Sequence, residues 1–378
     1  MEKERKIGPI IILIGFIVII CFSWLLWIFF EKYVNAENHE NRTPASKPVF
    51  NLDGYADYAD SFDLYFNDNM PFRNNLVSLN SKIDFFIFDK STSDSVIKGK
   101  DGWLFFAKTL SDYQKYNLYT DEQLEEIKNN VLVTEKYFEE RGIQFAIFIG
   151  PNKSSIYGDY MPDRYETNDG ASRTDQVVEY LRENTDVNII YPKEELLEAR
   201  EKYPELILYQ KLDTHWNFMG GYFGTKPLLE SLDVNVSDFF SISYELVNEP
   251  VFYWNGYDMA NMLGLSDVLN NDYNYNISGF SDNVVNYEGD TRNNVDDFNG
   301  AIRTTSDAAD DRKVFFARDS YGEAMTQYLA QSFSEVYSVH RGSMTISQIE
   351  QENPDIFIYE VVERDADLNG VNIGGWAQ

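Results

Sequence analysis

The residues that could do chemistry begin with His215, in the stretch KLDTHWNFMGGY at 211–222. The chain has only three histidines, and this one has Asp213 two residues before it and Trp216 directly after it. In an extended segment, side chains at i and i+2 point to the same side, so Asp213 can bind the Nδ1 proton of His215 and leave Nε2 free as a base. A polar turn that only caps the next helix, through Asn217, is the alternative. The spacing alone leaves both open.

The candidate nucleophile is Ser320, in KVFFARDSYGEAMTQYLAQSF. An apolar strand runs into Asp319-Ser320-Tyr321-Gly322, and a helical pattern follows. A serine on this turn lies at the carboxyl edge of the strands, where open α/β sheets bind their ligands. Backbone N–H groups at the helix N-terminus can stabilise an oxyanion, and Gly322 allows a close approach of the chain. A serine that only caps the helix is the alternative.

The elements that must position these residues alternate along the chain. Buried-type apolar strands are predicted at 145–150, 313–317 and 355–362, and amphipathic helices at 173–184 and 193–202. Strands of this type between helices predict an α/β fold, with a mainly parallel sheet covered on both faces.

The rest of the chain after residue 50 has a less regular pattern. Apolar spacings of three and four predict two short helices on either side of Pro71, and 98–106 predicts a turn that runs into a strand. We interpret the Asn/Asp-rich stretch 270–311 as an insertion, because it has few periodic apolar residues. Its part from 281 to 300 lacks the Gly and Glu positions of a calcium loop, so no metal is expected there.

Polar residues also follow two of the predicted strands. Pro151-Asn152-Lys153 comes after the strand at 145–150, and a structural turn is the favoured interpretation. Glu360, Glu363 and Arg364 lie in and after the last strand, and we interpret them as a mutually paired structural cluster.

The N-terminus predicts a membrane anchor. Residues 7–30 form an uncharged apolar run, long enough for a helix to cross the hydrocarbon layer. The run is longer than a signal-peptide core and ends in bulky residues rather than a small-residue cleavage site. Basic residues precede it, so we expect a cytoplasmic tail at 1–6, the anchor at 7–30, a linker at 31–50 and an extracytoplasmic catalytic domain at 51–378.

Composition narrows the choice of partners. The 378 residues carry a formal net charge of −30, and 43% of them are hydrophobic. Such acidity argues against nucleic acid, whose binding needs clusters of Lys and Arg. It favours a neutral or cationic substrate over a strongly anionic polymer. The single cysteine, Cys21, lies in the apolar run, so the exterior domain has neither a disulfide nor a cysteine nucleophile.

The order of the motifs resembles the SGNH-like acetyltransferases of bacterial exopolysaccharide modification, the alginate O-acetyltransferase family. The resemblance covers roughly 55 to 365. It rests on DTHWN and ARDSYG, about a hundred residues apart, with support from YFNDNMPFRNNLV, KGKDGWLFF and FIGPNKSSIYGDYMP. It implies an SGNH-hydrolase-like α/β/α sandwich with Ser320 as nucleophile, His215 as base and Asp213 orienting the base. Arg318-Asp319 precede the serine, where the ordinary SGNH block has a glycine.

The resemblance also implies an activity: an acetyl group passes through an acyl-serine to a hydroxyl of a cell-surface or exported polysaccharide. A membrane-bound O-acyltransferase would supply the acetyl group. No motif for a CoA nucleotide is visible, and no cofactor is expected. Tyr321 and Trp216 are candidates to stack on sugar rings, and Arg341 to hydrogen-bond the substrate. An acetyl esterase with the same triad and a non-catalytic glycan-binding scaffold of an export complex are the alternatives.

Overall fold

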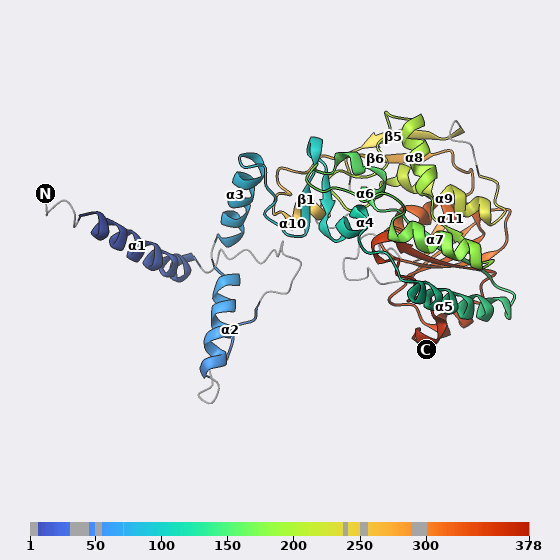
Figure 1. Ribbon diagram of the computed structural model, residues 1–378, viewed down its shortest axis with the longest axis horizontal. Coiled ribbons are helices and arrows are strands. Elements are labelled where there is room, and N and C mark those ends of the chain that lie inside the picture. The colour runs from blue at the N-terminus through green and yellow to red at the C-terminus, as the bar shows by residue number, and fades with distance from the viewer. Residues whose placement is uncertain are drawn as a thin grey trace. The chain divides into compact units, whose positions relative to one another are not determined.

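The computed structural model consists of two compact units, Met1–Ser93 with Asn261–Ser266, and Asp94–Ala260 with Asp267–Gln378 (Figure 1). The residues that the structure describes are 7–30, 45–49, 55–70, 72–236, 241–249, 256–288 and 301–377.

The first unit contains three long helices, α1 (Ile7–Phe30), α2 (Tyr55–Asp68) and α3 (Arg73–Phe86). The predicted pair of short helices is confirmed by α2 and α3; Pro71 itself lies outside the described residues. The predicted anchor segment is helical as α1. Among the described residues, no helix has the length and apolarity needed to cross a membrane. The anchor and the orientation inferred from it therefore stay predictions.

A seven-stranded sheet organises the second unit, in the order β4-β3-β11-β9-β10-β8-β7. The first five strands are parallel, and β8 and β7 add to the edge in antiparallel pairing. The mainly parallel α/β sheet predicted from the sequence is therefore confirmed. The strands are β3 (Gln144–Gly150), β4 (Asn188–Ile190), β7 (Val285–Glu288), β8 (Ile302–Ser306), β9 (Lys313–Arg318), β10 (Glu335–His340) and β11 (Ile356–Val362).

Helices cover both faces of this sheet (Figure 1). Successive side chains of β3 point to opposite faces: Phe148 packs in the core with α8, α9 and α11, and Ile147 and Ile149 pack in the core with α5 and α7. The helices are α4 (Leu110–Gln114), α5 (Asp121–Glu139), α6 (Lys153–Ile156), α7 (Arg173–Asn184), α8 (Lys193–Lys202), α9 (Phe218–Ser231), α10 (Asp258–Met262), α11 (Glu323–Ser332) and α12 (Ile346–Glu352).

The structure adds detail to two of the predicted stretches. The stretch 270–311, which we interpreted as an insertion, contains the strands β6 (Asn274–Ser278), β7 and β8. The last two of these strands extend the main sheet. The stretch 98–106 holds the predicted turn running into a strand, β2 (Leu104–Phe106), and β1 (Val96–Lys98) before the turn pairs with that strand. Asp101 and Gly102 take positive φ angles of 51° and 79° in that turn. Strand β5 (Ser243–Val247) pairs with β6 in a separate small sheet.

Short 3₁₀ turns complete the second unit. They lie at Lys100–Gly102, Ala107–Thr109, Gly158–Tyr160, Glu363–Asp365 and Ile373–Gly375.

Candidate active site

The loop between α8 and α9 holds the predicted Asp–His pair. Tyr209 and Trp216 form an antiparallel bridge, and the backbone N–H of Gln210 donates to the carbonyl of His215 at 3.1 Å. The loop is therefore a narrow hairpin that feeds directly into α9. Asn217 caps that helix, as predicted, because its Oδ1 accepts from a backbone N–H of the first turn at 3.0 Å.

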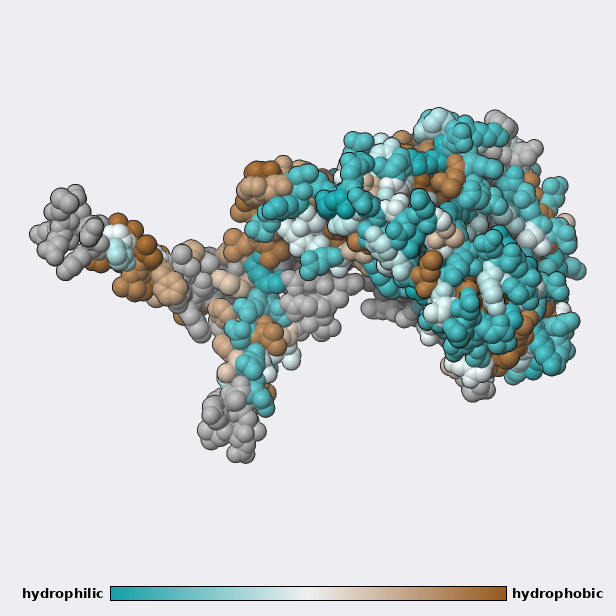
Figure 2. All heavy atoms as spheres, viewed as in Figure 1, coloured by the Kyte–Doolittle hydropathy of each residue, from teal (hydrophilic) through white to brown (hydrophobic). Residues whose placement is uncertain are grey.

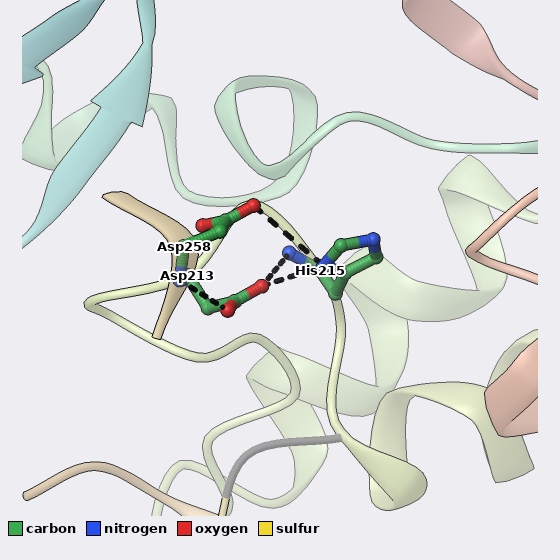
Figure 3. Close-up of side chains that lie close together, drawn as sticks. All are labelled: Asp213, His215 and Asp258. Atoms are coloured by element: carbon green, nitrogen blue, oxygen red, sulfur yellow. Dashed lines mark hydrogen bonds and ion pairs between the residues drawn. The ribbon is translucent and has the colours of Figure 1, made fainter. Parts of the chain in front are cut away.

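Asp213, His215 and Ser320 are brought together in one hydrogen-bonded chain. Asp213 Oδ1 lies 2.5 Å from His215 Nδ1 and also accepts from the His215 backbone N–H at 3.1 Å (Figure 3). On the other side of the ring, His215 Nε2 lies 2.8 Å from Ser320 Oγ. Because a carboxylate faces Nδ1, the proton belongs on that nitrogen, and Nε2 is placed to accept the proton of the serine.

A second carboxylate, Asp258 at the start of α10, belongs to the same cluster (Figure 3). Its oxygens accept from the backbone N–H of Thr214 at 2.8 Å and from the Thr214 hydroxyl at 2.5 Å. Its own backbone N–H donates to Asp213 Oδ2 at 2.8 Å. Asp258 therefore fixes both the carboxylate and the turn that hold His215. Nothing in the sequence points to Asp258, because it lies 43 residues beyond His215 and outside any motif.

The two carboxylates are in different electrostatic states. Burial raises the pKa of Asp258 to about 6, and the charge of Asp213 adds to this effect. Burial acts on Asp213 in the same direction, but His215 and the hydrogen bonds to its oxygens outweigh it and hold the pKa of Asp213 below its ordinary value. Asp213 is therefore the ionised partner of His215.

Asp213, His215 and Asp258 also form a group that could hold a metal ion. The ligand atoms of Asp213, His215 and Asp258 lie within 4.8 Å of one another. The carboxylate oxygens already accept hydrogen bonds from protein donors, and the imidazole is shared with Ser320. The donor set thus fits a proton relay better than an ion site.

Ser320 stands on the turn between β9 and α11. The Asp319 carboxylate holds this turn, because it accepts from the backbone N–H groups of Tyr321 at 2.9 Å and Val362 at 2.8 Å. The Asp319 backbone in turn donates to the buried Glu360 at 2.7 Å. A Cβ on Gly322 would lie 2.6 Å from the Cβ of Arg318, so the close approach predicted for this glycine is real. The turn is over-determined by buried polar contacts, which keeps the Ser320 hydroxyl in place.

Two hydrogen bonds join the serine turn to the histidine loop. The Tyr321 hydroxyl donates to the carbonyl of Thr214 at 2.6 Å, and the Trp216 indole donates to the carbonyl of Tyr321 at 2.9 Å. Tyr321 is 1% exposed and Trp216 is fully buried. Their rings have no face open to a sugar, so the predicted stacking roles are corrected: both residues instead lock the two halves of the site together.

Arg341 follows β10 at the same edge of the sheet. Its Nε lies 3.9 Å from a carboxylate oxygen of Asp319, and its backbone N–H donates to the carbonyl of Arg318 at 2.6 Å. The side chain retains 27% exposure, so one part supports the serine turn and another part stays open to solvent. Its predicted contact with substrate remains a prediction.

Asn152, just beyond β3, is the most conspicuous residue that the sequence analysis assigned only to a turn. Its side chain is fully buried, and within the described residues neither its amide oxygen nor its amide nitrogen has a hydrogen-bond partner. Its backbone N–H donates to Glu363 at 2.6 Å, and a Cβ on neighbouring Gly150 would lie 3.0 Å from the Tyr321 ring. A buried amide without a partner calls for an explanation, and a hydrogen bond to a substrate oxygen is the candidate that we carry forward.

Lys153 holds the histidine loop, which is the loop between α8 and α9, by hydrogen bonds to its backbone. Its Nζ donates to three carbonyl groups of that loop, those of Gln210 at 2.9 Å, Lys211 at 3.1 Å and Asp213 at 2.7 Å. The side chain is 4% exposed, and burial lowers its pKa to about 8. The strand end that carries Asn152 therefore also fixes the position of Asp213.

A family model described as the SGNH hydrolase-like domain of the acetyltransferase AlgX matches residues 96–248. Over these residues the chain is similar to the SGNH hydrolase-like domain of that acetyltransferase. The resemblance predicted from the motifs is confirmed over this range, which contains Asp213 and His215 but ends before Ser320. No curated protein sequence matches the chain.

The chain is similar to several solved structures. PatB1 from Bacillus cereus, in a structure with a sulfonyl adduct, is 14% identical, with 75% of this chain and 100% of that chain covered and a TM-score of 0.51. A DHHW family protein from Eubacterium siraeum is 15% identical, with coverages of 75% and 99% and a TM-score of 0.49. The O-acetyltransferase domain of Pseudomonas putida AlgJ is 15% identical, with coverages of 73% and 92% and a TM-score of 0.45. The likeness to PatB1 shows that this chain shares the fold of PatB1.

Proposed function

We propose that this protein is a membrane-anchored, extracytoplasmic O-acetyltransferase, which moves an acetyl group through an acyl-serine at Ser320 to hydroxyl groups of a cell-surface or exported polysaccharide. The observation that carries the proposal is the chain of contacts from Asp213 through His215 to Ser320, at 2.5 and 2.8 Å. The AlgX-type domain supports acetyl transfer as the reaction class.

In the first step the serine takes the acetyl group from a donor ester. His215 Nε2 accepts the hydroxyl proton as Ser320 Oγ attacks the acetyl carbonyl carbon. The oxygen of the tetrahedral intermediate then carries the negative charge. The Ser320 backbone N–H, which has no acceptor within the described part of the chain, and the free Asn152 amide are the candidate donors to that oxygen. The leaving group departs with the proton from His215.

In the second step a sugar hydroxyl gives its proton to His215 Nε2 and attacks the acyl carbonyl. Ser320 Oγ leaves and recovers the proton, and Asp213 stabilises the imidazolium that forms in both steps. Water in place of the sugar would make the same residues an acetyl esterase. Acceptor choice, and not the relay, therefore separates these two activities.

The proposed setting follows from the sequence and not from the relay. An anchor at 7–30 with its basic side inside would place the domain outside the cytosol. There the donor would be a membrane-bound O-acyltransferase, because cytosolic acetyl-CoA is out of reach. The net charge of −30 disfavours a polyuronate acceptor and favours a neutral or cationic glycan.

The test follows acetyl groups from an activated acetyl ester in the presence of candidate oligosaccharides, with free acetate and acetylated sugar quantified separately. We expect acetylated sugar with wild type and none with Ser320→Ala. Ser343→Ala, at the same edge of the sheet but outside the relay, is the matched control and should behave as wild type. Acetate alone would favour the esterase. If folded protein gives neither acetate nor acetylated sugar, the glycan-binding scaffold is the interpretation that remains.

A further inference from the structure

Helix α3 of the first unit presents an apolar stripe to solvent. Its members are spaced by three and four residues, which puts them on one face of the helix. Figure 2 shows hydrophobic side chains gathered over this helix. The exposed fractions are large for side chains of this kind: Leu76 54%, Leu79 54%, Ile83 38%, Phe86 58% and Ile87 71%.

This stripe is not the packing face of the helix. On the opposite side, Ser81 is 2% exposed and Phe85 is 6% exposed, and the Ser81 hydroxyl lies 3.0 Å from the hydroxyl of Thr92. Helix α3 therefore already buries one side within the described structure, and its second apolar side is left over. Phe88, just beyond the helix, is a further exposed aromatic residue, at 59%.

Helix α3 differs from the rest of the chain in its charge. The whole chain carries a net charge of −30, and the neighbouring α2 contains four aspartates. The stretch 73–90 has three basic residues and only two acidic ones. An anionic bilayer would repel the acidic surface of the molecule but not this segment.

We propose that the stripe of α3 lies in the interface of the lipid bilayer, with the helix axis along the membrane surface and the packed side, which carries Ser81 and Phe85, turned away from the lipid. A helix with Leu, Ile and Phe on one face and Asn, Ser and Lys on the others suits this position. The inference rests on the proposed anchor for one point: α1 ends at Phe30, so α3 is tethered by the 42 residues between them. A tether raises the local concentration of lipid, so little intrinsic affinity is needed.

The test uses the full chain with Cys21→Ser, which removes its only cysteine. A polarity-sensitive fluorophore is attached at Leu79→Cys or Phe86→Cys on the stripe, or at Ser78→Cys, the matched control one residue off the stripe. The proteins are reconstituted into phosphatidylethanolamine–phosphatidylglycerol vesicles with acyl chains brominated near the headgroup. We expect several-fold stronger quenching at the two stripe positions than at Ser78→Cys.

The other outcomes contradict the inference in distinguishable ways. If the protein floats with vesicles but the three labels are quenched equally, the anchor holds and α3 does not touch lipid. If the fluorescence emission of the labels on the stripe shifts to the blue without vesicles, and shifts further at higher protein concentration, the stripe binds a second copy of this chain. If the chain does not float at all, both the anchor and the inference fail. Acetyl transfer by Ser320 is measured separately and is unaffected by these results.

Discussion

Asn152→Leu should separate catalysis from stability. The side chain is fully buried, and its amide has no protein partner in the described residues, so the substitution breaks no hydrogen bond of the resting protein. A buried polar group without a partner costs about 1–3 kcal/mol, and leucine has a similar size. We therefore expect the free energy of unfolding of Asn152→Leu to stay level or to rise by up to about that amount.

Catalysis should respond in the opposite direction. If the amide nitrogen donates to the oxyanion, its loss removes an interaction worth about 3–4 kcal/mol, or roughly 10²–10³ in the rate of acylation. The assays are urea unfolding and the single-turnover rate at which an activated ester acylates the protein.

Asn217→Leu is the matched control for that experiment. Asn217 is also fully buried, but its amide oxygen accepts from Gly220 and its amide nitrogen donates to the carbonyl of Ile207. This variant should lose about 1–3 kcal/mol of stability for each buried partner left unpaired. The reasoning is refuted if Asn152→Leu is destabilised as strongly as Asn217→Leu, or if it acylates at the wild-type rate.

Substitutions at three further positions test the residues that support the site. Lys153→Met leaves three buried carbonyls without their donor, but also removes a buried cation; we expect a loss of about 2–4 kcal/mol in urea unfolding, and an unchanged stability would contradict the bracing role. Asp258→Ala should slow acylation about tenfold and Asp258→Asn should restore most of it, because the amide oxygen still accepts from Thr214; equal rates for both variants would argue against positioning. Burial raises the pKa of Glu363 to about 7, so between about pH 4.5 and 7 the folded protein holds a proton that the unfolded chain has lost. The unfolding free energy of wild type, relative to that of Glu363→Gln, should therefore fall by about 3 kcal/mol across this pH range. A difference in unfolding free energy that does not change with pH would refute this prediction.

Periodicity and burial-type strands predicted most of the second unit. The helices expected at 173–184 and 193–202 have those bounds, because each has a clear apolar spacing and α7 also has a capping box at Ser172. Strand β8 escaped prediction because its sequence, IRTTS, carries little hydrophobic signal although Ile302 and Thr304 are buried. Among the described strands, only β7 lies between β8 and the edge of the sheet, and three of the five residues of β8 are only partly buried polar side chains, so hydrophobicity alone does not reveal it.

The site was predicted in part. Asp213 and His215 are neighbours in sequence, and the order of motifs placed Ser320 with them; the structure brings the three together. Burial was the missing information for Trp216 and Tyr321, since an aromatic beside a reactive residue can stack on a ligand or fill the core, and here both fill the core.

The roles of Lys153 and Asp258 could not be read from the sequence, because each holds the histidine loop from a distant part of the chain. The unpaired amide of Asn152 becomes visible only in the folded protein. One signal was available: Asn152 and Lys153 directly follow a buried parallel strand, at the edge where such sheets bind ligands.

The central claim is that Ser320 carries the acetyl group. The most direct measurement is intact-mass spectrometry of the protein after brief exposure to an activated acetyl ester, followed by peptide mapping of the modified residue. The account predicts the added mass of one acetyl group on wild type, located at Ser320 and absent from Ser320→Ala and from His215→Ala. An acetyl group that persists in folded Ser320→Ala, or one that maps to another residue in wild type, would contradict it.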